Sequence, residues 1–164
     1  MDDFVEISHK GFRFIISKNP VNKSVNSYIK ELKKRNVGVV IRACKPSYDT
    51  KPLFKAGIQV YDLTIEDGAS PSEEMLSIFF NIIKKQFCDS PDDGIAIHCV
   101  AGLGRAPVLV AVALIELGYT YEDAVDLIRR KRRGAINAKQ LNFLANYKPK
   151  SRLKDGKKRS CVIQ

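Results

Sequence analysis

Residues 94–118, GIAIHCVAGLGRAPVLVAVALIELG, decide the fold. The apolar run at 94–98 is typical of a buried strand, and residues 105–117 are apolar around nearly the whole circumference of a helix that ends at Gly118. A glycine-rich turn joins the two. Such a turn presents several backbone N–H groups and the positive end of the helix dipole to one point. We therefore expect an anion site between the strand and the helix.

Composition places the chain among globular proteins of one domain. It has 164 residues, of which 45% are hydrophobic and 28% charged. The N-terminus is acidic and has no apolar run, so we expect no secretory signal and a cytosolic protein. The longest apolar stretch, residues 106–115, is about half the roughly 20 residues that cross a bilayer, and this predicts a core helix.

Hydrophobic periodicity predicts an alternation of strands and helices. The predicted strands lie at residues 4–8, 12–17, 37–43, 58–63 and 94–99, and the predicted helices at 22–36, 71–87, 105–117, 120–133 and 137–147. The last three strands are apolar enough to be central and covered on both faces. This order predicts an α/β three-layer fold, in which helices flank a central, mostly parallel sheet of about five strands.

The turn itself carries the residue types of a phosphate-binding loop. Gly102 and Gly104 allow the backbone to curl with positive φ where needed, and the guanidinium of Arg105 matches phosphate oxygens. The thiolate of Cys99, at the base of the loop, would be stabilised by the same donors and could act as a nucleophile. The residues expected to bind phosphate are Val100, Ala101, Gly102, Leu103, Gly104 and Arg105. The alternative is a structural corner with a buried, inert cysteine.

The Cys-x5-Arg spacing resembles the protein tyrosine phosphatases, and residues 94–118 look specifically like the phosphatase of regenerating liver (PRL, type IVA) family. The segments ELKKRNVGVVIRAC, DGASPS, YEDAV and KRRGAINAKQL resemble that family in the same order, so the likeness runs from about Phe4 to the C-terminus. The resemblance implies the cysteine-phosphatase fold and a dual-specificity-like enzyme that acts on phosphoproteins without a cofactor. Cys99 would form a phosphocysteine, and Arg105 would hold the phosphoryl group.

The leaving group needs a proton donor, because an alkoxide or phenolate departs poorly. The match to the family implies Asp67 as this acid, with Glu66 and Asp62 as alternatives; an acidic turn without a catalytic role is the remaining interpretation. The sequence departs from the usual Trp-Pro-Phe-Asp-Asp pattern of the family, since Leu63 and Thr64 replace the Trp and Pro and Glu66 the first Asp. This departure puts the rigidity of the loop in question.

Ala106 follows the arginine, where most cysteine phosphatases carry a Ser or Thr whose hydroxyl assists hydrolysis of the phosphocysteine. The PRL family also has Ala here. We therefore expect a long-lived intermediate and slow turnover. The alternative function is a phosphate- and redox-regulated binding module, and the resemblance implies a CNNM-type magnesium transport mediator as its partner.

Two cysteines end predicted strands, Cys44 and Cys99. If these strands are parallel neighbours, the two thiols lie at the same edge of the sheet, and the resemblance implies a reversible disulfide between them. The alternative is that they never meet. Cys88 is expected to be ordinary packing. The cysteines show no CxxC spacing, and His9 and His98 are the two histidines, so we expect no metal site.

His98 and Gln140 each have two interpretations. Neighbouring residues on a strand point to opposite faces, so His98 is expected to fix the loop through hydrogen bonds, with direct base catalysis of Cys99 as the alternative. The resemblance implies that Gln140 helps to place phosphate or water. The alternative for Gln140 is an exposed helix residue.

Residues 148–164 form a polybasic tail after a phosphatase domain at residues 1–147. The tail holds +6 of the net charge of +10 and ends in CVIQ, a Cys-a-a-X pattern that predicts farnesylation of Cys161, with carboxyl methylation. A prenyl group and basic residues together bind anionic lipids. We expect the protein at the cytoplasmic face of the plasma membrane and endosomes, or in the cytosol if it is not prenylated.

A second basic run, Arg129–Arg133, ends a predicted helix. It is either a solvated face that complements the helix dipole or a docking surface for an acidic partner or phosphoinositide headgroups. Without interleaved aromatic residues, neither basic run indicates nucleic-acid binding. The PRL resemblance also suggests self-association at the membrane.

Overall fold

The computed structural model describes residues 3–153, which are built around one five-stranded sheet. The strands are β1 (Phe4–His9), β2 (Phe12–Ser17), β3 (Val37–Arg42), β4 (Gln59–Asp62) and β5 (Gly94–His98), and their order across the sheet is β1-β2-β5-β3-β4. β2, β5, β3 and β4 are parallel, whereas β1 is antiparallel to β2. The predicted mostly parallel sheet is confirmed.

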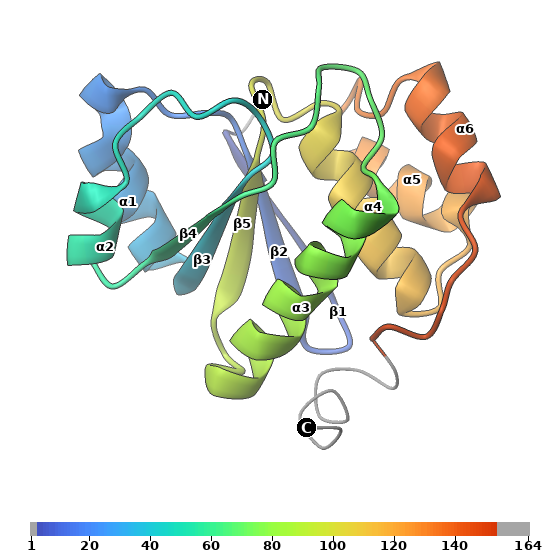
Figure 1. Cartoon of the computed structure of the whole chain (residues 1–164), viewed down its shortest axis with the longest axis horizontal. Helices are drawn as coiled ribbons and strands as arrows, with labels where there is room; N and C mark the ends of the chain where they lie inside the picture. The colour runs from blue at the N-terminus through green and yellow to red at the C-terminus, as the bar shows by residue number, and fades with distance from the viewer. Residues whose placement is uncertain (1–2, 154–164) are drawn as a thin grey trace.

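Helices cover both faces of the sheet (Figure 1). They are α1 (Val25–Lys34), preceded by a short 3-10 turn (Asn22–Ser24), then α2 (Lys51–Lys55), α3 (Glu73–Asp89), α4 (Arg105–Glu116), α5 (Tyr121–Lys131) and α6 (Ala138–Asn146). α1 and α2 lie on one face, and α3 to α6 lie on the other. The predicted three layers are therefore confirmed. α2 was not predicted, because five residues are too few to show a helical period.

One strand prediction is wrong. We expected residues 58–63 to form a central strand covered on both faces, but β4 is an edge strand that pairs with β3 alone. Gln59 and Asp62 are exposed and the residues between them only half-buried. β2 takes the covered position instead, because β1 pairs with its other edge.

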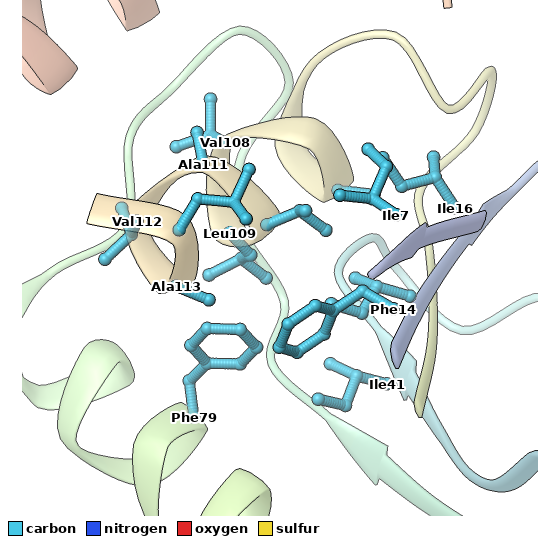
Figure 2. Packing of buried hydrophobic residues seen from close by; sticks show 14 of the residues in the cluster. Ile7, Phe14, Ile16, Ile41, Phe79, Val108, Leu109, Ala111, Val112 and Ala113 are labelled. Carbon is cyan, nitrogen blue, oxygen red and sulfur yellow. The ribbon is translucent and has the colours of Figure 1, made fainter. Parts of the chain in front are cut away.

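The buried central helix is α4, as predicted. All twelve of its residues are buried, including the charged residues at both ends. Leu109 and its neighbours pack among side chains of the sheet and of α3, such as Phe14, Ile41 and Phe79 (Figure 2). Each fully buried Val or Leu contributes roughly 1.5–3 kcal/mol to folding, so this helix is fixed firmly against the sheet. Within residues 3–153, no helix combines the length and apolar character needed to span a membrane.

The C-terminal end of α4 holds the segment that follows α6. The carboxylate of Glu116 accepts hydrogen bonds from the backbone N–H groups of Lys150 (3.0 Å) and Arg152 (2.9 Å), and from the hydroxyl of Tyr147. Leu153 is fully buried in the main hydrophobic cluster. Lys150, Arg152 and Leu153, which the sequence prediction placed in the tail, are thus held against the domain. We call this arrangement the Glu116 clamp.

Candidate active site

The glycine-rich turn lies at the C-terminal edge of the sheet. β5 ends at His98, Cys99 follows it with 3% of its surface exposed, and α4 begins at Arg105 with Gly104 as its N-cap. Because β5 and α4 are both fully buried, the two ends of the turn are fixed. Cys99 is therefore held next to the positive end of the α4 dipole, where an anion is stabilised.

The two glycines of the turn are required for different reasons. Gly102 has φ +69°, and a Cβ there would lie 3.0 Å from the carbonyl oxygen of Ser17. Gly104 has φ −131°, so the expected positive φ applies to Gly102 and not to Gly104. At Gly104 a Cβ would instead lie 3.0 Å from the side-chain amide of Gln140. One glycine serves the curvature of the loop, and the other makes room for α6.

Arg105 joins the turn to the acidic loop that follows β4. Its guanidinium is buried, donates to the carbonyl oxygen of Ile65 (Nη1 to O, 3.0 Å) and forms an ion pair with Asp67 (Nη2 to Oδ1, 3.6 Å). The Asp67 side chain is 96% exposed. The Asp67 carboxylate therefore lies beside the guanidinium of the turn and is open to solvent.

The other two candidate acids differ from Asp67. Asp62 forms a two-pronged ion pair with Arg42 (2.6 and 3.0 Å), whose guanidinium also donates to the carbonyl oxygen of Tyr48. Asp62 is therefore engaged in holding the β3–α2 loop. Glu66 is exposed in the same turn as Asp67. Of the three carboxylates, it is Asp67 that forms an ion pair with Arg105.

Apolar anchors hold the acidic loop in the absence of the usual Trp and Pro. Leu63 and Ile65 are 5% and 3% exposed and belong to the main hydrophobic cluster. Their backbone N–H groups donate to the carbonyl oxygens of Arg42 (2.9 Å) and Ala43 (3.1 Å), which extends the pairing with β3 beyond β4. The loop therefore starts from a fixed base, while Asp67 remains at the surface.

His98 is fully buried behind the turn. Its Nε2 lies 2.7 Å from the hydroxyl of Tyr48, and its Nδ1 lies 4.0 Å from Sγ of Cys44. Burial lowers the pKa of His98 to about 4, against the opposing effect of a hydrogen bond with the backbone of Cys99. The ring is thus neutral at physiological pH, and its contacts favour the expected role of fixing the loop over base catalysis.

Cys44 and Cys99 leave neighbouring parallel strands. Arg42 of β3 is paired with His98 of β5, and the N–H of Ala43 donates to the carbonyl oxygen of His98 (2.8 Å). Both thiols are free and buried in this structure. Burial raises the pKa of the Cys44 thiol, and the guanidinium of Arg105 acts in the opposite direction.

The basic run Arg129–Arg133 is exposed at the C-terminal end of α5 except for one residue, so the interpretation as a solvated face holds for four of its five members. Arg132 is fully buried, and Arg129 donates to two backbone carbonyls in the turn after α5. Lys131 donates to the carbonyl oxygen of Glu6, and Arg130 pairs with Asp126. Arg132 is thus the exception in an otherwise exposed run, and no pattern in the sequence distinguishes it from its neighbours.

Gln140 is not the exposed helix residue that was one of its interpretations. It is 1% exposed, and it forms a capping box with Asn137 at the start of α6. Its Nε2 donates to the carbonyl oxygen of Ala69 (3.4 Å), and its side chain packs against Gly104. Gln140 therefore lies between the phosphate loop and the acidic loop.

The chain is similar over most of its length to known phosphatases. A family model described as "Polymorphic toxin system, DSP-PTPase phosphatase" matches residues 16–119. The chain is 54% identical over 160 residues to "PRL-1 phosphatase" of Drosophila melanogaster, which covers 96% of this chain and 91% of that protein. It is 49% identical over 164 residues to "Protein tyrosine phosphatase type IVA 3" of Homo sapiens, with 97% and 95% covered. The chain belongs to the PRL, or type IVA, family of protein tyrosine phosphatases.

A solved structure of a putative protein tyrosine phosphatase from Leishmania major superposes on the chain with a TM-score of 0.78 and 36% identity, and covers 89% of this chain and 98% of the other. The fold is therefore the cysteine-phosphatase fold, as the resemblance to PRL proteins implied. Membership of the family makes the chain a protein tyrosine phosphatase, an enzyme that hydrolyses phosphoric monoesters.

Proposed function

We propose that this PRL protein dephosphorylates proteins through a phosphocysteine at Cys99. The proposal is carried by one arrangement: Cys99 lies at the base of the turn into α4, while Arg105 reaches from that turn to Asp67. The thiolate of Cys99 attacks phosphorus and the P–O bond to the substrate breaks. Asp67 donates its proton to the departing oxygen. Water then attacks phosphorus, the S–P bond breaks, Asp67 takes the proton of the water, and phosphate leaves.

The test compares two variants with a matched control on a phosphotyrosine peptide. Cys99→Ser is expected to abolish turnover, and Asp67→Asn to lower kcat by about 10²–10⁴-fold, the usual contribution of a general acid. Glu66→Gln removes the adjacent exposed carboxylate and is expected to keep near-normal kcat. Full activity in Cys99→Ser would remove the proposal, and equal losses in Asp67→Asn and Glu66→Gln would remove Asp67 as the acid.

We further propose that the phosphocysteine is long-lived. Ala106 is fully buried in the first turn of α4 and brings no hydroxyl to the departing thiolate. Ala106→Ser is expected to release phosphate faster and to reduce the burst seen in rapid-mixing experiments. An unchanged burst and an unchanged steady-state rate would exclude this explanation of slow turnover.

A long-lived phosphocysteine supports a second proposed function, which is the binding of a partner of the CNNM type in the phosphate pocket. A charged phosphocysteine would exclude an acidic loop of the partner, so phosphorylation of Cys99 would switch binding off. Cys99→Ser is expected to retain binding, and Cys99→Asp, which carries a negative charge, to lose it. If both variants bind alike, the pocket is not the docking site.

We further propose that peroxide oxidises Cys99 to a sulfenic acid and that the Cys44 thiol then displaces water to form a reversible disulfide; the parallel pairing of β3 with β5 supports this proposal. Peroxide treatment is expected to link the two thiols and to inactivate the enzyme until a thiol reductant is added. In Cys44→Ser the inactivation is expected to become irreversible. Peptide mass analysis that finds no such link would oppose it.

Cys161 and residues 154–164 lie outside the described residues, so membrane tethering is proposed from the CVIQ pattern and the basic tail. Wild-type protein is expected in the membrane fraction of cells, and Cys161→Ser in the soluble fraction. Equal fractionation of the two would contradict the proposal.

A further inference from the structure

Arg129 lies on α5, away from the residues assigned to the reaction. Its guanidinium donates through Nε to the carbonyl oxygen of Ala135 (2.9 Å) and through Nη2 to that of Ile136 (2.8 Å). The planar fork of an arginine holds two acceptors in one fixed geometry, whereas a lysine ammonium is a point charge on a flexible stem that imposes no such geometry. Arg129 therefore fixes the backbone of the connection between α5 and α6.

The backbone of Ile136 needs such support. Ile136 has φ +68°, a left-handed conformation that is strongly disfavoured for a β-branched residue. In this conformation its N–H donates to the carbonyl oxygen of Leu103 in the phosphate loop (2.6 Å). Ile136 is thus hydrogen-bonded both to the phosphate loop, through its N–H, and to Arg129, through its carbonyl oxygen.

The same segment also reaches the acidic loop. The side-chain amide of Asn137 lies 3.5 Å from the carbonyl oxygen of Gly68, and that of Gln140 lies 3.4 Å from the carbonyl oxygen of Ala69. Residues 135–140 therefore contact the loop that carries the proposed nucleophile and the loop that carries the proposed acid. A shift of this segment would disturb both.

We propose that Arg129 is a positioning residue for the phosphatase reaction, which sets the phosphate loop through Ile136. This inference rests on the proposed function of the loop. It predicts that loss of the fork weakens the binding of tetrahedral and trigonal-bipyramidal oxyanions and lowers kcat, although Arg129 itself does not contact the substrate.

The chain offers a matched control. Arg130 lies next to Arg129 on α5 and pairs with Asp126 at the surface, where both side chains are about two-thirds exposed. Arg130→Met removes the same charge from the same helix and leaves the fork intact. Comparison with Arg129→Met therefore separates the fork from the general loss of a positive charge.

The experiment measures orthovanadate affinity, kcat and KM on a phosphotyrosine peptide, and the melting temperature of each variant. Arg129→Met and Arg129→Lys are expected to bind orthovanadate at least ten-fold more weakly and to lose at least ten-fold in kcat, at a temperature where both are folded. Arg130→Met is expected to stay within two-fold of wild type. Backbone amide shifts of Leu103 and Gly104 in ¹⁵N NMR spectra are expected to move in the Arg129 variants alone.

Three outcomes would overturn the proposal. If Arg129→Lys keeps the orthovanadate affinity and kcat of wild type, a positive charge at this position is enough and the fork is not needed. If folded Arg129 variants lose thermal stability but keep normal orthovanadate affinity and kcat, Arg129 is purely structural. If Arg130→Met matches Arg129→Met, the effect is electrostatic. Wild-type protein that binds orthovanadate without any turnover would instead contradict the proposed function, while the affinities would still test Arg129.

Discussion

His98 illustrates how burial fixes the chemistry of a single residue at this site. The ring is held by Tyr48 on one nitrogen and lies near Cys44 on the other, with Tyr28 in edge contact at 6.1 Å between ring centroids. Desolvation keeps it neutral, so it adds no charge behind Cys99. A neutral histidine there can still orient the backbone of the loop.

Acid should therefore destabilise the fold through His98. Its pKa is 6.5 when unfolded and about 4 when folded, so the unfolded chain binds the proton first, and stability present above pH 6.5 is lost as pH falls towards 4. This linkage predicts a loss of about 2 kcal/mol between pH 7.5 and pH 5. Urea unfolding of wild type and His98→Gln at the two pH values measures it.

The control for this effect is His9→Gln, because His9 is only half-buried at the end of β1 and is the other histidine of the chain. Wild type and His9→Gln should lose nearly the same stability on acidification, and His98→Gln should lose less. An equal loss of unfolding free energy on acidification in all three proteins would show that His98 is not the group that titrates.

Residues of the site differ in how far sequence could find them. Cys99, Gly102 and Arg105 lie within seven consecutive residues, so their spacing alone predicts a phosphate loop. Tyr48 and Arg129 reach the site from loops and helices far along the chain, and no period or motif marks them. Their roles depend on tertiary contacts, which the order of residues does not contain.

At the scale of elements, the phosphate loop depends on one left-handed residue. Gly102 has φ +69° and lies against the end of β2, so any side chain there meets both backbone strain and the carbonyl oxygen of Ser17 at 3.0 Å. Gly134, after α5, has φ +81° with open space around it. Comparison of Gly102 with Gly134 therefore separates the cost of a positive φ from the cost of steric contact with an added Cβ.

Gly134→Ala is expected to cost roughly 1–2 kcal/mol, the usual penalty of a left-handed conformation for a residue with a Cβ. Gly102→Ala is expected to cost more and also to weaken orthovanadate binding, because the loop must move away from β2. Unfolding free energies and binding titrations on both variants check this. Equal losses of stability with normal binding would show that the loop absorbs the extra methyl group.

Elements were predicted best where their periodicity is strong. α4 and β5 were predicted correctly because every residue in them is buried, and the sequence therefore shows a clear apolar run at each. The central placement of residues 58–63 was wrong because hydrophobicity alone does not tell which strand becomes an edge. α2 was missed because its five residues show no period.

At the scale of the whole molecule, the Glu116 clamp joins the core to the C-terminal segment. Glu116 has a fully buried side chain, and the donors around it are backbone N–H groups, a tyrosine hydroxyl and the more distant Arg152 guanidinium at 3.8 Å. Arg152 and Lys150 also pair with Glu73 at the start of α3. Three parts of the chain therefore meet at this point.

Glu116→Gln should destabilise the protein by about 3 kcal/mol, because it breaks a buried charge pair and turns one acceptor into a donor that faces other donors. Faster hydrogen exchange at the amides of Lys150 and Arg152 should accompany the loss. Glu122→Gln, an exposed change at the start of α5, is the control and should have little effect. Unchanged exchange in Glu116→Gln would mean that the apolar burial of Leu153 holds the segment by itself.

The Glu116 clamp also determines where on the domain a lipid-modified C-terminal segment would begin. If Cys161 carries a lipid, eight residues, from Lys154 to Cys161, separate it from the described domain, and even fully extended they could span at most about 30 Å. The clamp lies at the opposite end of α4 from the phosphate loop, a helix about 18 Å long (Figure 1). A lipid attached beyond residue 153 would therefore join the domain at the end of α4 that is far from the phosphate loop.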